Sequence, residues 1–315
     1  MSKLKVVFMG TPQFSVGILD SILKSNFEVV AAITVADKPA GRGLKLNKSA
    51  VKIYCEDNNI LVLQPTNLKD EAFLNELNSF NADVFIVVAF RMLPKVVWSM
   101  PIKGTFNLHA SLLPDYRGSA PINWTIINGD KETGLSTFFI DDKIDTGDVI
   151  LQKKLLISEN ESAGELHDRM IIDGSELVIE TLQKIELGKI ITTKQTELTT
   201  NRQAPKLTKE NTEIDWTKDV VEIHNLIRGL NPYPGAWTIW ENHKGEQKQV
   251  KIFKTLISEE RSQNEIGLYR IGKKIYFQNE FGNLEILEFQ IEGKKKMTSI
   301  DWLVGNEIGH WRILN

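Results

Sequence analysis

The sequence has very little cysteine, because Cys55 is the only one among its 315 residues. A single thiol excludes an internal disulfide framework and any zinc or iron–sulfur site built from several cysteines. Such sparing use of cysteine is typical of a reducing compartment, so we expect a cytoplasmic protein. No other metal-binding pattern is evident in the sequence, and we expect no bound metal.

Long hydrophobic runs are also absent. The longest apolar stretch, Val84–Phe90, is far shorter than the roughly 18 residues that a membrane-spanning helix requires. The apolar run near the start, Val6–Met9, is too short for the hydrophobic region of a signal peptide. We therefore expect a chain that is neither secreted nor inserted in a membrane.

Neither sign of charge predominates. The sequence has 38 Lys and Arg against 41 Asp and Glu, and its formal net charge is -3. This near balance excludes a globally basic nucleic-acid binder, so any nucleic acid must be held by a local cationic patch. With 42% hydrophobic residues the chain can bury a substantial core, and its length favours two domains.

The first half of the sequence alternates short apolar runs with amphipathic segments of helix length. This alternation is typical of βαβ units around a parallel sheet, and the nearly unbroken apolar runs indicate that both faces of the sheet are covered. We therefore predict an α/β, Rossmann-like domain with a mostly parallel sheet. The predicted strands are Lys5–Met9, Val29–Val35, Ile60–Leu63, Val84–Ala89, Thr105–Leu108, Leu135–Asp141 and Asp148–Ile157, and the predicted helices are Phe14–Leu23, Ser49–Asp57 and Asp70–Leu77.

A long amphipathic helix marks the end of this domain. Ser162 followed by Glu165 is a capping box, in which each side chain satisfies a free backbone donor of the first turn, and Gly188 is a suitable stop. From residue 189 to about residue 210 the sequence is polar and aperiodic, as in an interdomain linker. We predict a first domain at 1–188 and a linker at 189–210.

The remainder, residues 211–315, has a different pattern. One predicted helix, Val220–Leu230, is followed by Pro232 and Pro234 and then by several short strands, of which Leu287–Glu292 alternates strictly. Several such strands within about 80 residues indicate a small barrel or sandwich. We predict a second, smaller domain rich in β-structure.

Three polar residues form a candidate chemical site. Asn107 and His109 lie two apart at the end of a predicted strand, so both side chains project from one face, at the sheet edge where open α/β folds bind ligands. An amide that donates to an oxyanion, beside an imidazole that moves protons near neutral pH, suits acyl-group transfer. Asp145, in a later turn, can orient His109. Taken singly, such residues are more often strand-end and turn formers.

Taken together, Asn107, His109, Ser111–Pro114, Arg117–Gly118 and Asp145–Gly147 resemble the signature of the 10-formyltetrahydrofolate-dependent formyltransferases. The resemblance implies that Asn107 and His109 bracket the formyl group and that Asp145 completes the catalytic set. It also implies that 10-formyltetrahydrofolate is the co-substrate. The residues that line the folate pocket are then Ser111, Leu112, Leu113 and Pro114.

Three further segments, Gly10–Phe14, Asp37–Gly43 and Ala204–Leu207, resemble the members of this family that formylate methionyl initiator tRNA. The resemblance implies transfer to the α-amino group of methionine on that tRNA, for translation initiation. It also implies a small OB-like C-terminal barrel that contacts tRNA, and a cationic loop, Asp37–Lys48, that enters the acceptor end. The expected tRNA contacts are Lys38, Arg42, Lys45 and Lys206, and we expect a monomer.

Other functions stay open at this point. A related formyltransferase that acts on a small amine, such as an amino sugar or a ribosyl glycinamide, would share the site, and so would a hydrolase that releases formate. An RNA-binding adaptor is disfavoured because the set Asn107, His109 and Asp145 is complete. Ala89–Pro94 departs from the pattern of relatives, being one residue shorter and without glycine, so we expect the pocket wall there to differ.

Overall fold

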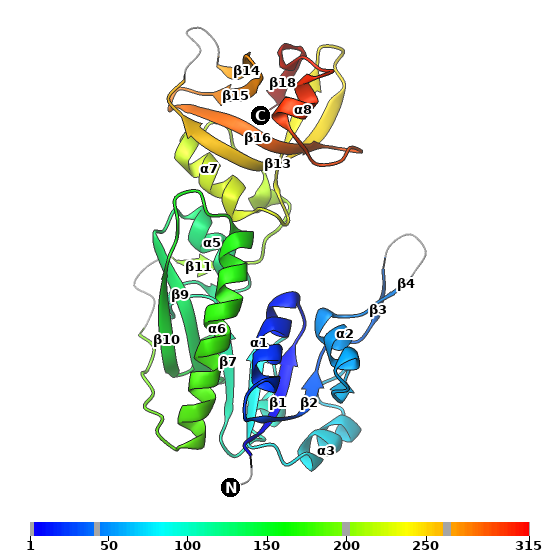
Figure 1. The fold of residues 1–315 in the computed structure, drawn as a ribbon, viewed down its shortest axis with the longest axis vertical. Coiled ribbons are helices and arrows are strands. Elements are labelled where there is room, and N and C mark those ends of the chain that lie inside the picture. Colours follow the sequence, from blue (N-terminus) through cyan, green and yellow to red (C-terminus); the bar gives the residue numbers. More distant parts are fainter. Residues whose placement is uncertain (1–2, 41–44, 197–201, 261–265, 315) are drawn as a thin grey trace. The chain divides into compact units, whose positions relative to one another are not determined.

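The computed structural model describes residues 3–40, 45–196, 202–260 and 266–314 (Figure 1). The chain divides into two compact units that interleave along the sequence. The first comprises Met1–Gly118, Thr133–Leu155 and His167–Gln203, and the second comprises Ser119–Glu132, Leu156–Leu166 and Ala204–Asn315. Two segments expected in the first domain therefore cluster with the second unit. The domain limits 1–188 and 211–315 stay a prediction.

The first unit is built on a mostly parallel sheet, as predicted. Its strand order is β10-β9-β7-β6-β1-β2-β5. The first five of these strands in sequence pair in parallel, whereas β9 pairs antiparallel with β7. The bounds are β1 (Lys5–Gly10), β2 (Glu28–Ile33), β5 (Val62–Leu63), β6 (Val84–Val88), β7 (Thr105–His109), β9 (Glu132–Phe139) and β10 (Val149–Leu156).

Helices cover both faces of this sheet, which is why its central strands are apolar throughout. On one face lie α1 (Gln13–Leu23) and α6 (Ala163–Glu186), side by side in Figure 1. On the other face, Val7 and Met9 of β1 share a buried cluster with α3 (Glu71–Ser79) and α4 (Lys95–Trp98). The remaining helix of the unit is α2 (Ala50–Asp57).

The predicted start of α6 is confirmed in detail. The backbone nitrogen of Ser162 donates to Oε2 of Glu165 at 2.8 Å, and the backbone nitrogen of Glu165 donates to Oγ of Ser162 at 3.2 Å. These are the two reciprocal bonds of a capping box. After the helix, Gly188 has a φ of 63°, in the left-handed region that favours glycine at a helix end.

The segment expected as a loop at Asp37–Lys48 is instead largely a hairpin. Its strands are β3 (Lys38–Ala40) and β4 (Lys45–Asn47), which pair antiparallel. The expectation of a loop was wrong at these two strands, because strands of three residues carry no readable periodicity. At the base of the hairpin, Nζ of Lys52 lies 2.6 Å from Oδ2 of Asp37. This contact holds the pKa of the Asp37 carboxyl below its usual range.

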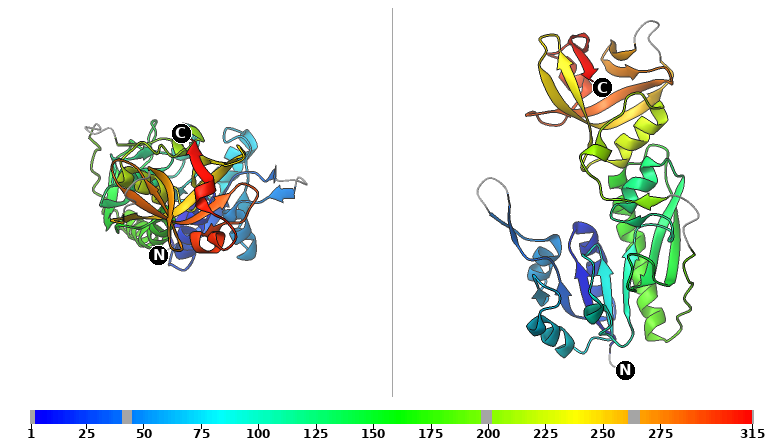
Figure 2. Two further views of the ribbon diagram at one scale, coloured as in Figure 1. Left: turned by 90° about the horizontal axis from the view of Figure 1, so that it is seen from above. Right: turned by 180° about the vertical axis from the view of Figure 1, so that it is seen from behind.

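The second unit contains a barrel-like antiparallel sheet (Figure 2), which confirms the expected β-rich second region. Its strand order is β14-β15-β16-β13-β12-β18, and β17 pairs with β16. Trp240, fully buried, lies 5.2 Å from Phe289 and 6.5 Å from Trp302 between ring centroids. The strands are β12 (Ala236–Asn242), β13 (Gln247–Ser258), β14 (Gly267–Ile271), β15 (Lys274–Gln278), β16 (Asn283–Ile291), β17 (Met297–Thr298) and β18 (Trp311–Leu314).

Helical elements complete this unit. Ile223 and Ile227 of α7 (Val220–Gly229) belong to the buried core, and Nδ2 of Asn123 in α5 (Pro121–Ile127) donates to the carbonyl oxygen of Gly229 at 2.7 Å. This contact explains why Ser119–Glu132 clusters with the second unit. The other described helical elements of this unit are η1 (Glu210–Thr212), α8 (Ser299–Leu303) and η2 (Ile308–His310). A separate two-stranded sheet pairs β8 (Arg117–Gly118), which belongs to the first unit, with β11 (Gln203–Ala204).

Candidate active site

The carboxyl end of β7 carries two of the three polar residues that the sequence singles out. Asn107 and His109 are alternate residues of this strand, so their side chains leave the same face of the sheet. In the ladder, Asn107 lies beside Val87 of β6, and His109 lies opposite Ser136 of β9. The pair is therefore at the edge where open α/β folds bind ligands.

His109 is buried, and the contacts of its ring determine its tautomer. Its Nε2 lies 2.9 Å from the carbonyl oxygen of Tyr116. A carbonyl oxygen only accepts hydrogen bonds, so this contact requires the proton on Nε2. Nδ1 lies 3.9 Å from Oδ2 of Asp145. In the neutral ring Nδ1 is unprotonated, which makes it the nitrogen that can take up or release a proton.

Asp145 lies in the turn between β9 and β10. Its φ is 55°, in the left-handed region that is uncommon for residues other than glycine. Its Oδ2 accepts a hydrogen bond from the backbone nitrogen of Gly118 at 3.0 Å. Two residues later, a Cβ at Gly147 would lie 1.7 Å from the carbonyl oxygen of Phe139. Only glycine fits there, so the turn needs this residue for its shape.

Asn107 differs from these two neighbours. It is half-buried within a strand whose other residues are buried. Its side-chain amide makes no hydrogen bond to another residue in the described part of the chain. An amide at this edge can donate to the oxygen of a carbonyl group under attack. The three side chains thus combine a hydrogen-bond donor, a proton-exchanging ring and a carboxylate.

Hydrogen bonds of Ser111 and Ser136 hold Ser111–Pro114, the segment expected to line a folate pocket. Oγ of Ser111 donates to the carbonyl oxygen of Asp115 at 2.6 Å. Oγ of Ser136 accepts from the backbone nitrogen of Leu113 at 3.0 Å and donates to the carbonyl oxygen of Ser111 at 2.6 Å. The Ser111 and Leu113 side chains are buried, whereas Leu112 and Pro114 are partly exposed. The first two therefore shape this segment, and the other two present its surface.

Sequence reasoning missed one residue next to the Asp145 turn. Gln195 lies in the predicted linker, and its Nε2 donates to the carbonyl oxygens of Asp145 at 3.0 Å and Gly147 at 2.8 Å. Its Oε1 accepts from Nε of Arg117 at 3.1 Å and from Nη2 at 2.6 Å. Arg117 is part of the motif that carries the family resemblance, whereas Gln195 is not. No sequence signal marks Gln195, since the linker is polar and aperiodic.

The candidate tRNA contacts are spread over the chain. Lys38 is exposed at the start of β3, and Lys45 begins β4 in the same hairpin. Arg42 lies outside the described residues. Lys206 is exposed and belongs to the second unit. The structure therefore brings two of the four into one hairpin.

The segment with the unusual sequence, Ala89–Pro94, follows β6 at the same edge of the sheet. Ala89 has a φ of 48°, and Nη1 of Arg91 donates to the carbonyl oxygen of Thr66 at 3.1 Å. The arginine thus ties this segment to the loop after β5. Phe90 packs on the cluster beneath α3 and α4.

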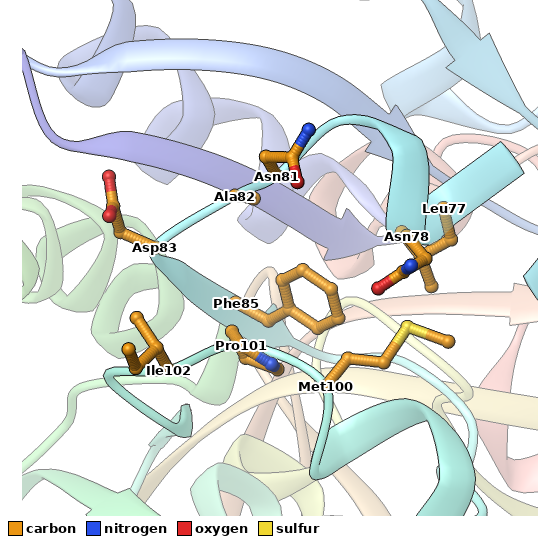
Figure 3. Close-up of a pocket in the computed structure, with 9 residues that line it drawn as sticks. All are labelled: Leu77, Asn78, Asn81, Ala82, Asp83, Phe85, Met100, Pro101 and Ile102. Atoms are coloured by element: carbon orange, nitrogen blue, oxygen red, sulfur yellow. The ribbon is translucent and has the colours of Figure 1, made fainter. Parts of the chain in front are cut away.

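A cavity of about 240 Å³ lies at the other end of the strands. Figure 3 shows Phe85 of β6 and Met100 extending toward Asn78, while Asp83 precedes the strand. Because these residues surround the amino ends of β6 and β7, the cavity is remote from His109. In the described part of the chain, no cluster of three or more His, Cys, Asp or Glu is arranged to hold a metal ion. None of the described helices is long and apolar enough to cross a membrane.

Comparison with known proteins identifies similar chains. Residues 3–182 match the family model described as formyl transferase, and residues 206–307 match the model of the formyl transferase C-terminal domain. A methionyl-tRNA formyltransferase of Flavobacterium johnsoniae is 56% identical over 306 residues, which cover 97% of each chain. One of Bacteroides thetaiotaomicron is 44% identical over 307 residues, which cover 96% of this chain and 95% of that protein.

Two solved structures share the fold. WlaRD, a sugar 3N-formyl transferase determined in the presence of dTDP and 5-N-formyl-THF, has a TM-score of 0.66 at 24% identity and covers 94% of this chain and 100% of its own. HypX from Aquifex aeolicus has a TM-score of 0.67 at 17% identity and covers 98% of this chain and 50% of its own. At these identities the likeness concerns the fold alone.

Proposed function

This chain belongs to the formyl transferase family and is an enzyme of that class; from that premise we propose that its acceptor is methionyl initiator tRNA. The formyl group comes from 10-formyltetrahydrofolate and goes to the α-amino group of the esterified methionine. The observation that carries the proposal is the 56% identity to a methionyl-tRNA formyltransferase over 97% of both chains.

The proposed reaction is attack of the neutral amine on the formyl carbon. A bond forms from the amine nitrogen to that carbon, the carbonyl oxygen gains negative charge, and the bond from the carbon to N10 of the folate then breaks. The side-chain amide of Asn107 donates a hydrogen bond to the carbonyl oxygen as negative charge develops on it. His109 exchanges protons through Nδ1, since Nε2 is engaged by the carbonyl oxygen of Tyr116.

Asp145 acts through His109 in this scheme. Its carboxylate, held by the backbone nitrogen of Gly118 at 3.0 Å, faces Nδ1 at 3.9 Å. A negative charge at this place stabilises the imidazolium that forms when Nδ1 takes the proton released by the amine. The proton then goes to N10 as the folate leaves, which returns His109 to its neutral form.

The folate lies, in this proposal, against Ser111–Pro114. The bonds from Ser136 hold this segment in one shape, and a rigid wall lowers the entropy that binding would otherwise cost. Leu112 and Pro114, partly exposed, supply the apolar surface. Chemistry of this kind uses the residues named here and requires no metal.

The tRNA is held by its acceptor stem in this proposal. Exposed Lys38 and Lys206 support such contacts, because ammonium groups attract phosphates and release counterions on binding. We also propose that the enzyme works as a monomer, which light scattering would test.

A single transfer assay tests the function. Labelled 10-formyltetrahydrofolate is offered with methionine-charged initiator tRNA, uncharged initiator tRNA, a charged elongator tRNA, an amino-sugar nucleotide and a ribosyl glycinamide. We expect rapid labelling of the charged initiator alone. Labelling of a small amine, or formate release without any acceptor, would overturn the proposal in favour of the corresponding alternative.

A further inference from the structure

We propose that Gln195 is a positioning residue of this active site. Its amide holds the Asp145 turn against Arg117 and so keeps the Asp145 carboxylate facing Nδ1 of His109. The inference rests on the proposed function for its activity assay, whereas its structural part is measured without any substrate.

The amide of Gln195 is used completely. Its nitrogen donates to the carbonyl oxygens of Asp145 and Gly147, at 3.0 and 2.8 Å, and so spans the turn. Its oxygen accepts two bonds from the guanidinium of Arg117, at 3.1 and 2.6 Å. An amide has two donor hydrogens and one acceptor oxygen. No other uncharged side chain of this length can make the same set of bonds.

These contacts form a closed ring that includes the Asp145 carboxylate. Arg117 is followed by Gly118, whose backbone nitrogen donates to Oδ2 of Asp145 at 3.0 Å. Arg117 is preceded by Tyr116, whose carbonyl oxygen contacts Nε2 of His109 at 2.9 Å. The imidazole and the carboxylate are therefore both held from the same three consecutive residues, and Gln195 connects those residues to the turn.

The backbone of the turn gives such a connection a further role. The left-handed φ of Asp145, 55°, is uncommon outside glycine, so contacts that hold the turn favour this conformation. Gln195 is itself fixed in place by two backbone bonds nearby. The nitrogen of Val149 donates to the oxygen of Thr193 at 2.9 Å, and the nitrogen of Thr193 donates back at 2.8 Å.

The structural test is amide hydrogen exchange at Gly118, followed by NMR. In Gln195→Leu, which keeps the side chain's size but none of its bonds, we expect exchange to become about tenfold faster as the Asp145 carboxylate loses its position. The matched control is Gln183→Leu on an exposed site of α6, where exchange at Gly118 stays unchanged. Equal exchange in wild type and Gln195→Leu would overturn the proposal.

The kinetic test separates positioning from general stability. We expect kcat of Gln195→Leu to fall by about 10- to 100-fold, while KM for both substrates stays within about twofold. Gln195→Glu should fall similarly, because a carboxylate would face two carbonyl oxygens and could not donate to them. A rise in KM with kcat retained would contradict a positioning role.

A double-mutant cycle completes the test. If Gln195 acts only through Asp145, then adding Gln195→Leu to Asp145→Ala costs less than about a further twofold in kcat. Full additivity of the two losses would overturn the proposal. If the wild-type enzyme transfers no formyl group to methionyl initiator tRNA, the proposed function fails, and exchange at Gly118 still decides the role of Gln195.

Discussion

The two units each bury a histidine, and the two rings have opposite surroundings. His109, at the sheet edge of the first unit, faces a carboxylate and a backbone carbonyl oxygen. His224, in the second unit, has Nδ1 at 2.9 Å from Oγ1 of Thr255, and its Nε2 has no partner in the described part of the chain. Burial and the positive charges of Arg228 and Lys131 lower the pKa of His224 to about 4.

The comparison shows that two buried histidines of one chain can lie in opposite electrostatic surroundings. The carboxylate of Asp145 lies 3.9 Å from Nδ1 of His109, whereas the guanidinium of Arg228 opposes a proton on His224. Arg228 is itself committed to structure, since its Nε donates to Oδ1 of Asn225 at 2.8 Å and its Nη1 donates to the carbonyl oxygen of Glu161 at 2.9 Å. The first cluster therefore suits proton exchange, and the second suits the packing of α7.

The most direct test of this difference between the two histidines is to replace each of them in turn. His109→Gln eliminates proton exchange at the site, so we expect formyl transfer to slow by about 100-fold or more with the folded state retained. His224→Gln, the matched substitution, should leave turnover within about twofold. Initial rates and melting curves of both variants give the answer. Equal losses of turnover would mean that the distinction between the two histidines is wrong.

The pH dependence of the free energy of unfolding should reveal the low pKa of His224. The unfolded chain binds a proton at His224 with the ordinary pKa of 6.5, and the folded chain binds it only near 4. The unfolded state therefore holds more protons between these values, so this contribution is complete above pH 6.5 and is lost as the pH falls toward 4. The loss amounts to about 3 kcal/mol in the free energy of unfolding. Urea unfolding across this range should show a flatter profile in His224→Gln, and identical profiles would refute the assignment.

A smaller effect is expected from removing the guanidinium in the second cluster. Arg228→Met leaves the Asn225 side-chain oxygen and the Glu161 carbonyl oxygen without their donor, which should lower the free energy of unfolding by about 2 kcal/mol. Arg312, an exposed arginine paired with Glu241, is the control, and Arg312→Met should change stability by less than about 1 kcal/mol. Chemical unfolding measures both. An unchanged free energy of unfolding in Arg228→Met would show that this cluster does not stabilise the fold.

The smallest predicted change concerns the start of α6. Ser162→Ala removes the acceptor for the backbone nitrogen of Glu165, so we expect a loss of about 1 kcal/mol in stability with turnover unchanged. Ser158→Ala, on an exposed residue a few positions earlier, should be nearly neutral. Thermal unfolding compares them, and a drop in kcat for Ser162→Ala would indicate that the cap influences the site.

Local pattern predicted most of the fold. The strand expected at Lys5–Met9 extends one residue further, to Gly10, and the helix expected at Ser49–Asp57 begins one residue later with Ser49 as its cap. Such agreement is expected where apolar periodicity and capping residues act over neighbouring positions. The hairpin of β3 and β4 escaped prediction because three residues are too few to show a period.

The sequence also predicts only part of the candidate site. Alternation along β7 was enough to predict that Asn107 and His109 share a face. That Asp145 orients His109 is a hypothesis from residue type that the resemblance to a family strengthens, because spacing along the sequence does not show that the two side chains meet. The interleaving of the two units, with Ser119–Glu132 joining the second, has no local signal, since it depends on contacts such as that of Asn123 with Gly229.

Amino-acid pattern alone predicts most of the helices and strands, the starts of α2 and α6, and the polar residues that end β7, because each of these follows from interactions within a few positions. The folded structure is needed to show which nitrogen of His109 faces the Asp145 carboxylate and how the Asp145 turn is held. Both depend on backbone carbonyl groups, of Tyr116 in one case and of Asp145 and Gly147 in the other. Every residue has a backbone carbonyl group, so the amino-acid pattern does not predict which of these groups will contact a given side chain in the folded chain.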